Sequence, residues 1–241
     1  MRSKFVKLAV AIALGLALAL TFSCSSGDDA EGDGSLITGN DTSGTFVDNR
    51  DSKSYKWVRI GGQVWMAENL NYDVPDNDSD VCYDNNSANC EIYGRLYNWN
   101  TAMVELPDCD DNSCKHRGIC PLGWHIPSDA DWNVLMKFIN PKCSANDDCA
   151  EAGTKLKATS GWEYNGTLGN GTDDYGFSAL PGGGGYPVGN FIDFGGIGKD
   201  GFWWNSSNPP YRRWMDYLNE YVYRNPEYVD NSLQSVRCLK D

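Results

Sequence analysis

Basic residues and histidine are scarce in this 241-residue chain. It has 20 Lys and Arg against 33 Asp and Glu, a formal net charge of −13 and two histidines, His116 and His125. Nucleic-acid binding needs a surplus of basic side chains to neutralise phosphates, so the charge excludes that class of partner. Two histidines are too few for a three-histidine metal site. Their number still allows a metal site made of two histidines and one carboxylate. We interpret His125, which precedes a predicted helix, as a structural residue.

The chain also lacks an apolar run long enough to cross a bilayer. Its longest run, Leu8–Phe22, has 15 residues, whereas a membrane-spanning helix needs about 20. Three basic residues precede the run, which is typical of a signal peptide over residues 1–23. The segment Leu20–Cys24 resembles a bacterial lipobox, so we expect a lipoprotein whose Cys24 carries palmitate; an ordinary secretory peptide is the alternative.

A polar segment, residues 24–51, follows the predicted signal peptide. It is rich in Gly, Ser, Asp and Thr, a composition that favours a flexible acidic tether. Its acidic cluster is either a solvated spacer or a signal for export to the surface. We therefore expect an exported protein that is held by its lipid at the outer membrane or cell surface, with one folded domain over residues 52–241.

Eight cysteines follow Cys24, and an even number in an exported domain indicates a disulfide framework. Three pairs lie close in sequence and the remaining two cysteines would close a long loop, which gives the pairings Cys82–Cys90, Cys109–Cys114, Cys143–Cys149 and Cys120–Cys238. Cysteines around His116 also fit a zinc site loosely, but the spacing and an oxidising compartment favour disulfides.

Periodicity predicts both strands and helices. Two β-rich runs, Tyr55–Ile60 and Gln63–Met66, flank a Gly-Gly turn and predict a hairpin. Apolar residues at helical spacing predict helices over Tyr93–Val104 and in the segment that starts at Ser128 and stops before Pro141.

The rest of the chain predicts short elements. Cys149–Ala158 fits a short third helix, and residues 211–218, 220–224 and 232–239 fit strands. Helices in the first half with strands near both ends predict an α+β domain whose ends share one sheet.

Seven sequence blocks in a fixed order together resemble the Fibrobacter succinogenes major paralogous domain, a family of exported and often lipidated bacterial proteins. The blocks are GGQVWMAENLNY, YGRLYNWNTAM, CPLGWHIPSDADWNVL, AGTKLKATSGW, DDYGFSALPGG, GFWWNSS and SVRCLKD. The resemblance covers Tyr55–Asp241. It implies a C-type lectin-like fold, with two or three helices on a twisted antiparallel sheet and a long irregular loop before the last strands. It also supports the Cys120–Cys238 pairing.

Catalytic and metal signatures are weak. The fold that the resemblance implies is also used by formylglycine-generating enzymes, in which a reactive cysteine pair lies late in the chain, but here only Cys238 follows Cys149. The calcium motif of sugar-binding lectins is missing, because Ser206 follows Trp204-Asn205 where an acid is expected. Acidic clusters such as Asp108/Asp110/Asp111 and Asn170/Asp173/Asp174 are more typical of turns than of metal sites. We expect no enzyme activity and no cofactor; calcium stays open.

Aromatic residues concentrate late in the chain, beside a glycine-rich run. Strand alternation predicts that about half of them are core, and we expect a ligand surface from Tyr186, Trp203, Trp204, Tyr211 and Trp214. The run contains the G-x-G-x-x-G pattern of nucleotide sites, but a β-type segment follows it where a helix is required. Its glycines therefore predict turns in a loop and no nucleotide partner.

These observations favour a non-catalytic binding or adhesion module of the cell envelope, with a polysaccharide or a protein as ligand. A structural envelope protein without a soluble ligand is the alternative, and an enzyme of the formylglycine-generating type is a third hypothesis.

Overall fold

The structure is a computed structural model that describes residues 37, 39–75, 80–104, 115–145, 147–207, 211–226 and 231–241. Contacts divide the chain after Glu31, and all described residues belong to the second unit. Within these residues no helix is both long enough and apolar enough to cross a membrane.

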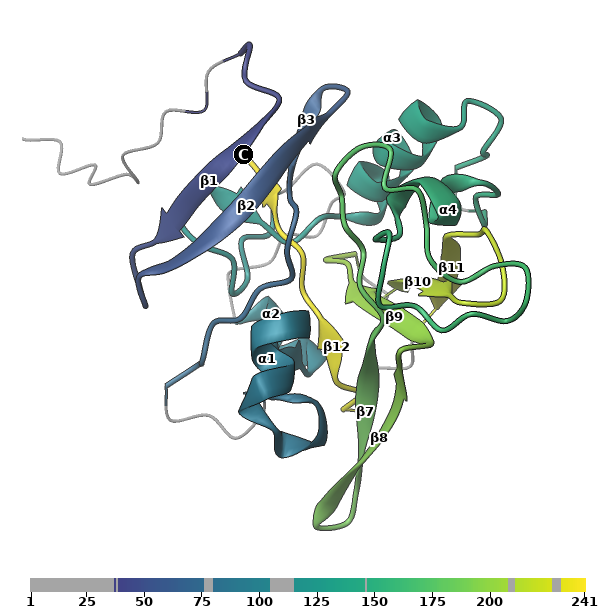
Figure 1. The fold of residues 1–241 in the computed structure, drawn as a ribbon. Coiled ribbons are helices and arrows are strands. Elements are labelled where there is room, and N and C mark those ends of the chain that lie inside the picture. The colour runs from purple at the N-terminus through teal and green to yellow at the C-terminus, as the bar shows by residue number, and fades with distance from the viewer. Residues whose placement is uncertain are drawn as a thin grey trace, which may run out of the picture. The chain divides into compact units, whose positions relative to one another are not determined.

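The described part is a mixed helix-and-sheet fold with few helices (Figure 1). Its helices are α1 (Ser87–Tyr93), α2 (Trp99–Met103), α3 (Asp129–Ile139) and α4 (Ala152–Leu156), with a 3-10 turn η1 (Tyr83–Asn85). The strands are β1 (Ser43–Asp48), β2 (Lys53–Ile60), β3 (Gln63–Met66), β4 (Asp80–Val81), β5 (Leu96–Tyr97), β6 (Trp124–His125), β7 (Gly182–Val188), β8 (Phe191–Ile197), β9 (Asp200–Trp204), β10 (Tyr211–Asp216), β11 (Tyr223–Pro226), β12 (Gln234–Ser235) and β13 (Leu239–Lys240).

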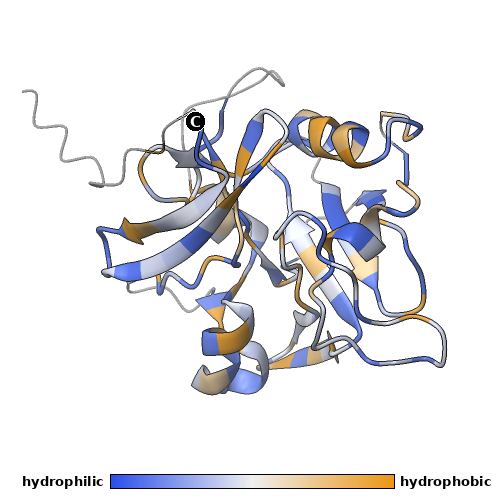
Figure 2. Cartoon of the chain, turned by 45° about the horizontal axis from the view of Figure 1, so that its top comes forward, coloured by the Kyte–Doolittle hydropathy of each residue, from blue (hydrophilic) through white to orange (hydrophobic). Residues whose placement is uncertain are grey.

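The first sheet has the order β1-β2-β3-β13-β6, so strands from both ends of the domain share it as predicted. Leu239 of β13 pairs with Trp65 on one side and His125 on the other. The predicted hairpin is confirmed, because β2 and β3 pair around the Gly-Gly turn. The longer elements, such as β2 and α3, carry both hydrophobic and hydrophilic residues (Figure 2), as expected when one face packs on a core.

The second sheet runs β11-β10-β9-β12-β5-β4, and the β7–β8 hairpin joins it through β9. Of the three C-terminal stretches predicted as strands, 211–218 contains β10, 220–224 overlaps the start of β11, and 232–239 contains β12 and reaches the first residue of β13. One core cluster lies between α3, α4 and strands of both sheets, and includes Trp65, Trp132 and Trp203.

Helix α3 begins and ends as the sequence predicts. The Ser128 hydroxyl accepts a hydrogen bond from the Asp131 amide, and the Asp131 carboxylate accepts one from the Ser128 amide, so the capping box is complete. Apolar residues at helical spacing are buried on one side of the helix: Trp132, Leu135, Met136 and Ile139. The short helix predicted within Cys149–Ala158 is α4.

The single helix predicted over Tyr93–Val104 is wrong. Helix α1 ends at Gly94, which has φ 76°, and a Cβ there would lie 2.8 Å from the Leu70 carbonyl oxygen. The next residues form β5, and a new helix, α2, starts after Asn98, whose side chain accepts a hydrogen bond from the Thr101 amide at 2.8 Å. A tertiary contact at one glycine therefore overrides the helical periodicity.

Three disulfides, Cys82–Cys90, Cys120–Cys238 and Cys143–Cys149, are present with the pairings that the sequence predicts. The predicted Cys109–Cys114 bridge lies outside the described residues. Because Cys120 is bonded to Cys238, it is not available to the alternative zinc site.

A buried arginine, Arg237, lies where distant parts of the chain meet. It is 1% exposed, and its Nε and Nη2 donate to Asn69 Oδ1 at 3.0 and 2.7 Å. Its Nη1 donates to the Phe177 carbonyl, and its guanidinium lies 4.4 Å from the Phe177 ring centroid. Trp203 Nε1 donates to the same Asn69 oxygen at 2.8 Å. Burial lowers the pKa of Arg237 to about 9, so carbonyls and rings stabilise a largely desolvated cation.

We expect Arg237→Lys to lower the free energy of unfolding by about 3 kcal/mol or more, because lysine cannot supply the forked donors and leaves buried acceptors unpaired. Chemical denaturation of the full chain measures the loss. The control is Lys142→Arg, which exchanges the same two residue types at an exposed position and should change stability by less than about 0.5 kcal/mol. Equal stability of the two variants would contradict the role of Arg237.

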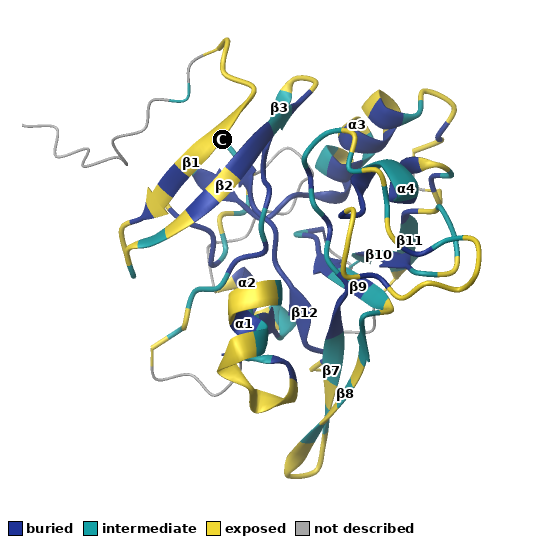
Figure 3. Ribbon diagram, viewed as in Figure 1, coloured by how far each residue is buried: buried dark blue, intermediate teal, exposed yellow. Residues whose placement is uncertain are grey.

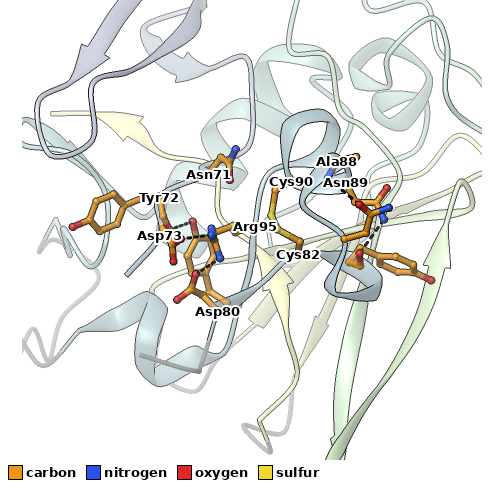
Figure 4. Close-up of a disulfide and its surroundings, with 12 residues drawn as sticks. Asn71, Tyr72, Asp73, Asp80, Cys82, Ala88, Asn89, Cys90 and Arg95 are labelled. Carbon is orange, nitrogen blue, oxygen red and sulfur yellow. Dashed lines mark hydrogen bonds and ion pairs between the residues drawn. A yellow bond between two sulfur atoms is a disulfide. The ribbon is translucent and has the colours of Figure 1, made fainter. Parts of the chain in front are cut away.

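A second arginine, Arg95, joins two acidic residues near the Cys82–Cys90 disulfide (Figure 4). Its Nη1 donates to Asp80 Oδ2 at 2.9 Å and its Nη2 to Asp73 Oδ2. Burial raises the pKa of Asp80 to about 6, although Arg95 acts in the opposite direction. The Asp80 carboxyl therefore binds a proton more tightly in the folded chain than in the unfolded chain.

The raised pKa makes Asp80 a source of pH-dependent stability. Its contribution is complete below about pH 4 and is lost as the pH rises through about 6. We expect Asp80→Asn to flatten this part of the profile, so that stability falls less between about pH 4 and pH 7. Denaturation at several pH values measures it, with Asp84→Asn at an exposed site as control. If the stability of Asp80→Asn depended on pH as that of the wild-type chain does, Asp80 would not be the source of this pH dependence.

Candidate functional site

The glycine-rich run forms a β-hairpin, so its prediction as an irregular loop is wrong. Strands β7 and β8 pair from Gly182–Ile197 to Val188–Phe191. The hairpin has one apolar side, because Ile192 and Phe194 pack against a small core, with the Phe194 and Tyr83 rings 5.1 Å apart. Its tip is exposed, whereas β9 and β12 beside its base are largely buried (Figure 3).

The glycines keep part of the role predicted for them. Gly196 and Gly198 have φ 83° and 78°, and they turn the chain from β8 into β9. The G-x-G-x-x-G pattern of Gly196–Gly201 therefore connects two strands. A dinucleotide cradle connects a strand to a helix, so the structural context of that motif is different.

Aromatic rings form a ladder across β9, β10 and β11. Trp214 lies opposite Phe202 on one side and Tyr223 on the other. The Trp214 ring centroid is 4.6 Å from that of Tyr223 and 6.0 Å from that of Phe202, and Tyr221 extends the row. All four rings are at least partly accessible to solvent. The ladder offers a continuous apolar surface with exposed ring edges and faces.

Trp203 and Trp204 do not belong to this surface, which corrects their prediction as ligand residues. They are 0% and 1% exposed, and each indole N–H donates to a buried acceptor, Asn69 Oδ1 and the Tyr97 carbonyl respectively, at 2.8 Å. Trp204 also packs edge-on against Trp99. Both tryptophans are core residues that anchor β9.

The other three predicted ligand residues are all accessible, but they divide between two faces. Tyr186 is 47% exposed on β7, and Trp214 is part of the ladder. Tyr211 is on the opposite face of β10 from Trp214, because strand residues an odd number apart point to opposite faces. It lies under Arg224, whose guanidinium is 3.6 Å from the ring centroid. Only Tyr186 and Trp214 therefore lie on the side of the ladder.

A depression of about 270 Å³ lies between the hairpin and the ladder. Its lining consists of glycine backbone with aromatic, acidic and polar side chains: Gly184, Gly185, Tyr186, Asp193, Gly195, Gly196, Asp200, Phe202, Arg212, Ser232, Leu233 and Gln234. The glycines leave the space open, since a Cβ at Gly195 would meet no atom within 4 Å. The sequence pattern missed Phe202, Arg212 and Gln234, which enter the site through strand pairing.

Two carboxylates and one guanidinium set the charge of the depression. Asp200 Oδ1 accepts a hydrogen bond from Trp214 Nε1 at 2.9 Å, and burial raises the pKa of this carboxyl. Asp193 is exposed on β8. The Arg212 guanidinium lies 4.8 Å from the Phe202 ring centroid. The site therefore combines aromatic faces with hydrogen-bond acceptors and hydrogen-bond donors.

Two further cavities lie elsewhere on the domain. One, of about 450 Å³, lies beside β2 and α1, where Lys53 Nζ donates to the Asn71 carbonyl and Tyr55 accepts from the Asn71 amide. The other, of about 510 Å³, lies beside His125, whose Nδ1 is 2.8 Å from Asp241 Oδ1. Neither cavity adjoins the aromatic ladder.

The remaining candidate metal residues are held in local contacts. His116 Nε2 is 2.8 Å from the Met103 carbonyl oxygen, and the Asp173 carboxylate accepts from the amide and hydroxyl of Ser178. Within the described part of the chain, no three His, Cys, Asp or Glu side chains gather as they would around a metal ion. Asp108, Asp110 and Asp111 lie outside that part.

Fold and site together define a disulfide-linked helix-and-sheet domain that presents an aromatic ladder and a glycine-lined depression. The chain belongs to the Fibrobacter succinogenes major domain family, whose model matches residues 58–240. This match confirms the resemblance carried by the seven sequence blocks. Comparisons with curated proteins and with solved structures gave no match.

Proposed function

We propose that the chain is a non-catalytic binding module of the cell envelope, which holds a polysaccharide against the aromatic ladder of a C-type lectin-like domain. The single observation that supports this most is the ladder of Phe202, Trp214 and Tyr223 beside an open depression. Sugar rings have apolar C–H faces that stack on such rings, and their hydroxyl groups match the neighbouring carboxylates.

A non-catalytic role agrees with the chemistry of the described residues. The late cysteine, Cys238, is bonded to Cys120, whereas an oxidase of the formylglycine-generating type needs a reactive thiol there. His125 is 2% exposed and is held beside Asp241. These contacts favour structural roles for both residues.

The proposed ligand surface is tested by retention of the full chain, in mild detergent, on insoluble polysaccharides such as cellulose, xylan and chitin. We expect Trp214→Ala and Tyr186→Ala to weaken retention about fivefold or more, because a lost ring contact is worth about 1 kcal/mol or more. Tyr164→Ala is the control, since Tyr164 is 75% exposed and is not part of the ladder or the depression.

Undiminished retention of Trp214→Ala would refute the ladder as the binding surface. No retention of the wild-type chain on any polysaccharide would favour the alternative, a structural envelope protein without a soluble ligand.

We further propose that Cys24 carries the lipid that anchors the module at the outer membrane or cell surface. The supporting feature is the apolar run Leu8–Phe22, which is separated from this cysteine by the single small residue Ser23. Cells labelled with radioactive palmitate should incorporate label into the wild-type chain and the control Ser25→Ala, but not into Cys24→Ala. Equal labelling of Cys24→Ala would rule out this anchor.

A further inference from the structure

The depression contains a buried polar atom without a partner. Gln234 of β12 is 2% exposed and is one of the residues that line the cavity. Its Nε2 donates to Ser232 Oγ at 3.1 Å, but its Oε1 has no hydrogen-bond partner among the described residues. An unpaired buried acceptor is unfavourable. Gln234 is a wall residue of the depression, so a ligand donor that reaches its side-chain amide would relieve this unpaired acceptor.

Charges around Gln234 restrict what that ligand is. Two carboxylates, those of Asp193 and Asp200, line the same depression as one guanidinium, that of Arg212. Arg212 is placed over the Phe202 ring, with its guanidinium 4.8 Å from the ring centroid. An anionic group would approach two carboxylates in a partly desolvated site, which is unfavourable. The acceptors therefore favour a ligand that donates hydrogen bonds and carries no negative charge.

The shape of the depression restricts the size of the ligand. Its volume of about 270 Å³ is below the range of about 300–1,000 Å³ that is typical for drug-sized ligands. Four of the lining residues are glycines, and a Cβ at one of them, Gly195, would meet no atom within 4 Å. Tyr186 and Phe202 line the same space with rings. A single sugar-sized ring with hydroxyl groups and one apolar face fits these dimensions.

We propose that the depression binds one uncharged sugar residue of the polysaccharide, whose hydroxyls donate to Gln234 Oε1 and Asp193 while its apolar face lies against Tyr186 and Phe202. This assignment rests on the proposed polysaccharide-binding function and adds the class of sugar that the module selects. The aromatic ladder then holds the neighbouring part of the same polymer.

Two pairs of polymers, each with a common backbone, test the selection: neutral hydroxyethyl cellulose against anionic carboxymethyl cellulose, and fully methyl-esterified polygalacturonate against polygalacturonate. Affinity electrophoresis of the full chain in mild detergent measures binding. We expect the neutral member of each pair to bind at least about tenfold more tightly at low salt, where charge repulsion is strongest.

Two variants test the site itself. Gln234→Met keeps the size of the side chain but removes the acceptor, and we expect affinity for the neutral polymer to fall about tenfold. Gly195→Leu fills the depression from a position with room for a side chain, and we expect binding to be lost. Gly62→Leu is the matched control, because Gly62 also has no atom within 4 Å of a Cβ and lies in the β2–β3 turn. Thermal unfolding verifies that each variant is folded.

The possible failures separate the two proposals. Equal or tighter binding of the anionic polymers, or unchanged binding in folded Gly195→Leu, would overturn the sugar site. If the sugar site is overturned but Trp214→Ala still binds polysaccharide more weakly than the wild-type chain, the polysaccharide function keeps its support. No binding of any of the four polymers by the wild-type chain would overturn both.

Discussion

The buried guanidinium of Arg237 is the contact on which the rest of the domain depends. It joins Asn69, Phe177 and Trp203, which are far apart in the sequence and come from three different blocks of the family pattern. Burying a charged guanidinium away from water is unfavourable unless each N–H donates to an acceptor and polarisable groups surround the charge. These segments must therefore meet in one arrangement, and the Cys120–Cys238 disulfide secures the chain beside it.

This core contact also orients the candidate site. Trp203 turns inward to Asn69, so its neighbour Phe202 turns outward, because successive strand residues point to opposite faces. Pairing of β9 with β10 then places Trp214 beside Phe202, and β11 adds Tyr223. Buried Trp203 on one face of β9 and buried Trp204 on the other thus hold the strand, so the row of rings that starts at Phe202 needs little further ordering when a ligand binds.

Local structure, such as a helix cap or a tight hairpin, was predictable from the sequence, whereas contacts between distant segments were not. The capping box of Ser128 and Asp131 and the Gly-Gly hairpin act over a few residues, and both were predicted correctly. Cysteine spacing also predicted the three bridges. The break at Gly94 depends on a backbone contact with Leu70, and no local pattern encodes that contact. Gln234 enters the depression only because β12 lies between β9 and β5.

The location of the ligand surface is the central claim, and hydrogen–deuterium exchange of the full chain with a bound neutral polysaccharide measures it directly. We predict slower exchange in residues 182–204 and 211–226, which carry the depression and the ladder, and unchanged exchange in β2 and α1. Protection centred on β2 and α1, around the cavity beside Lys53, would contradict the proposed surface.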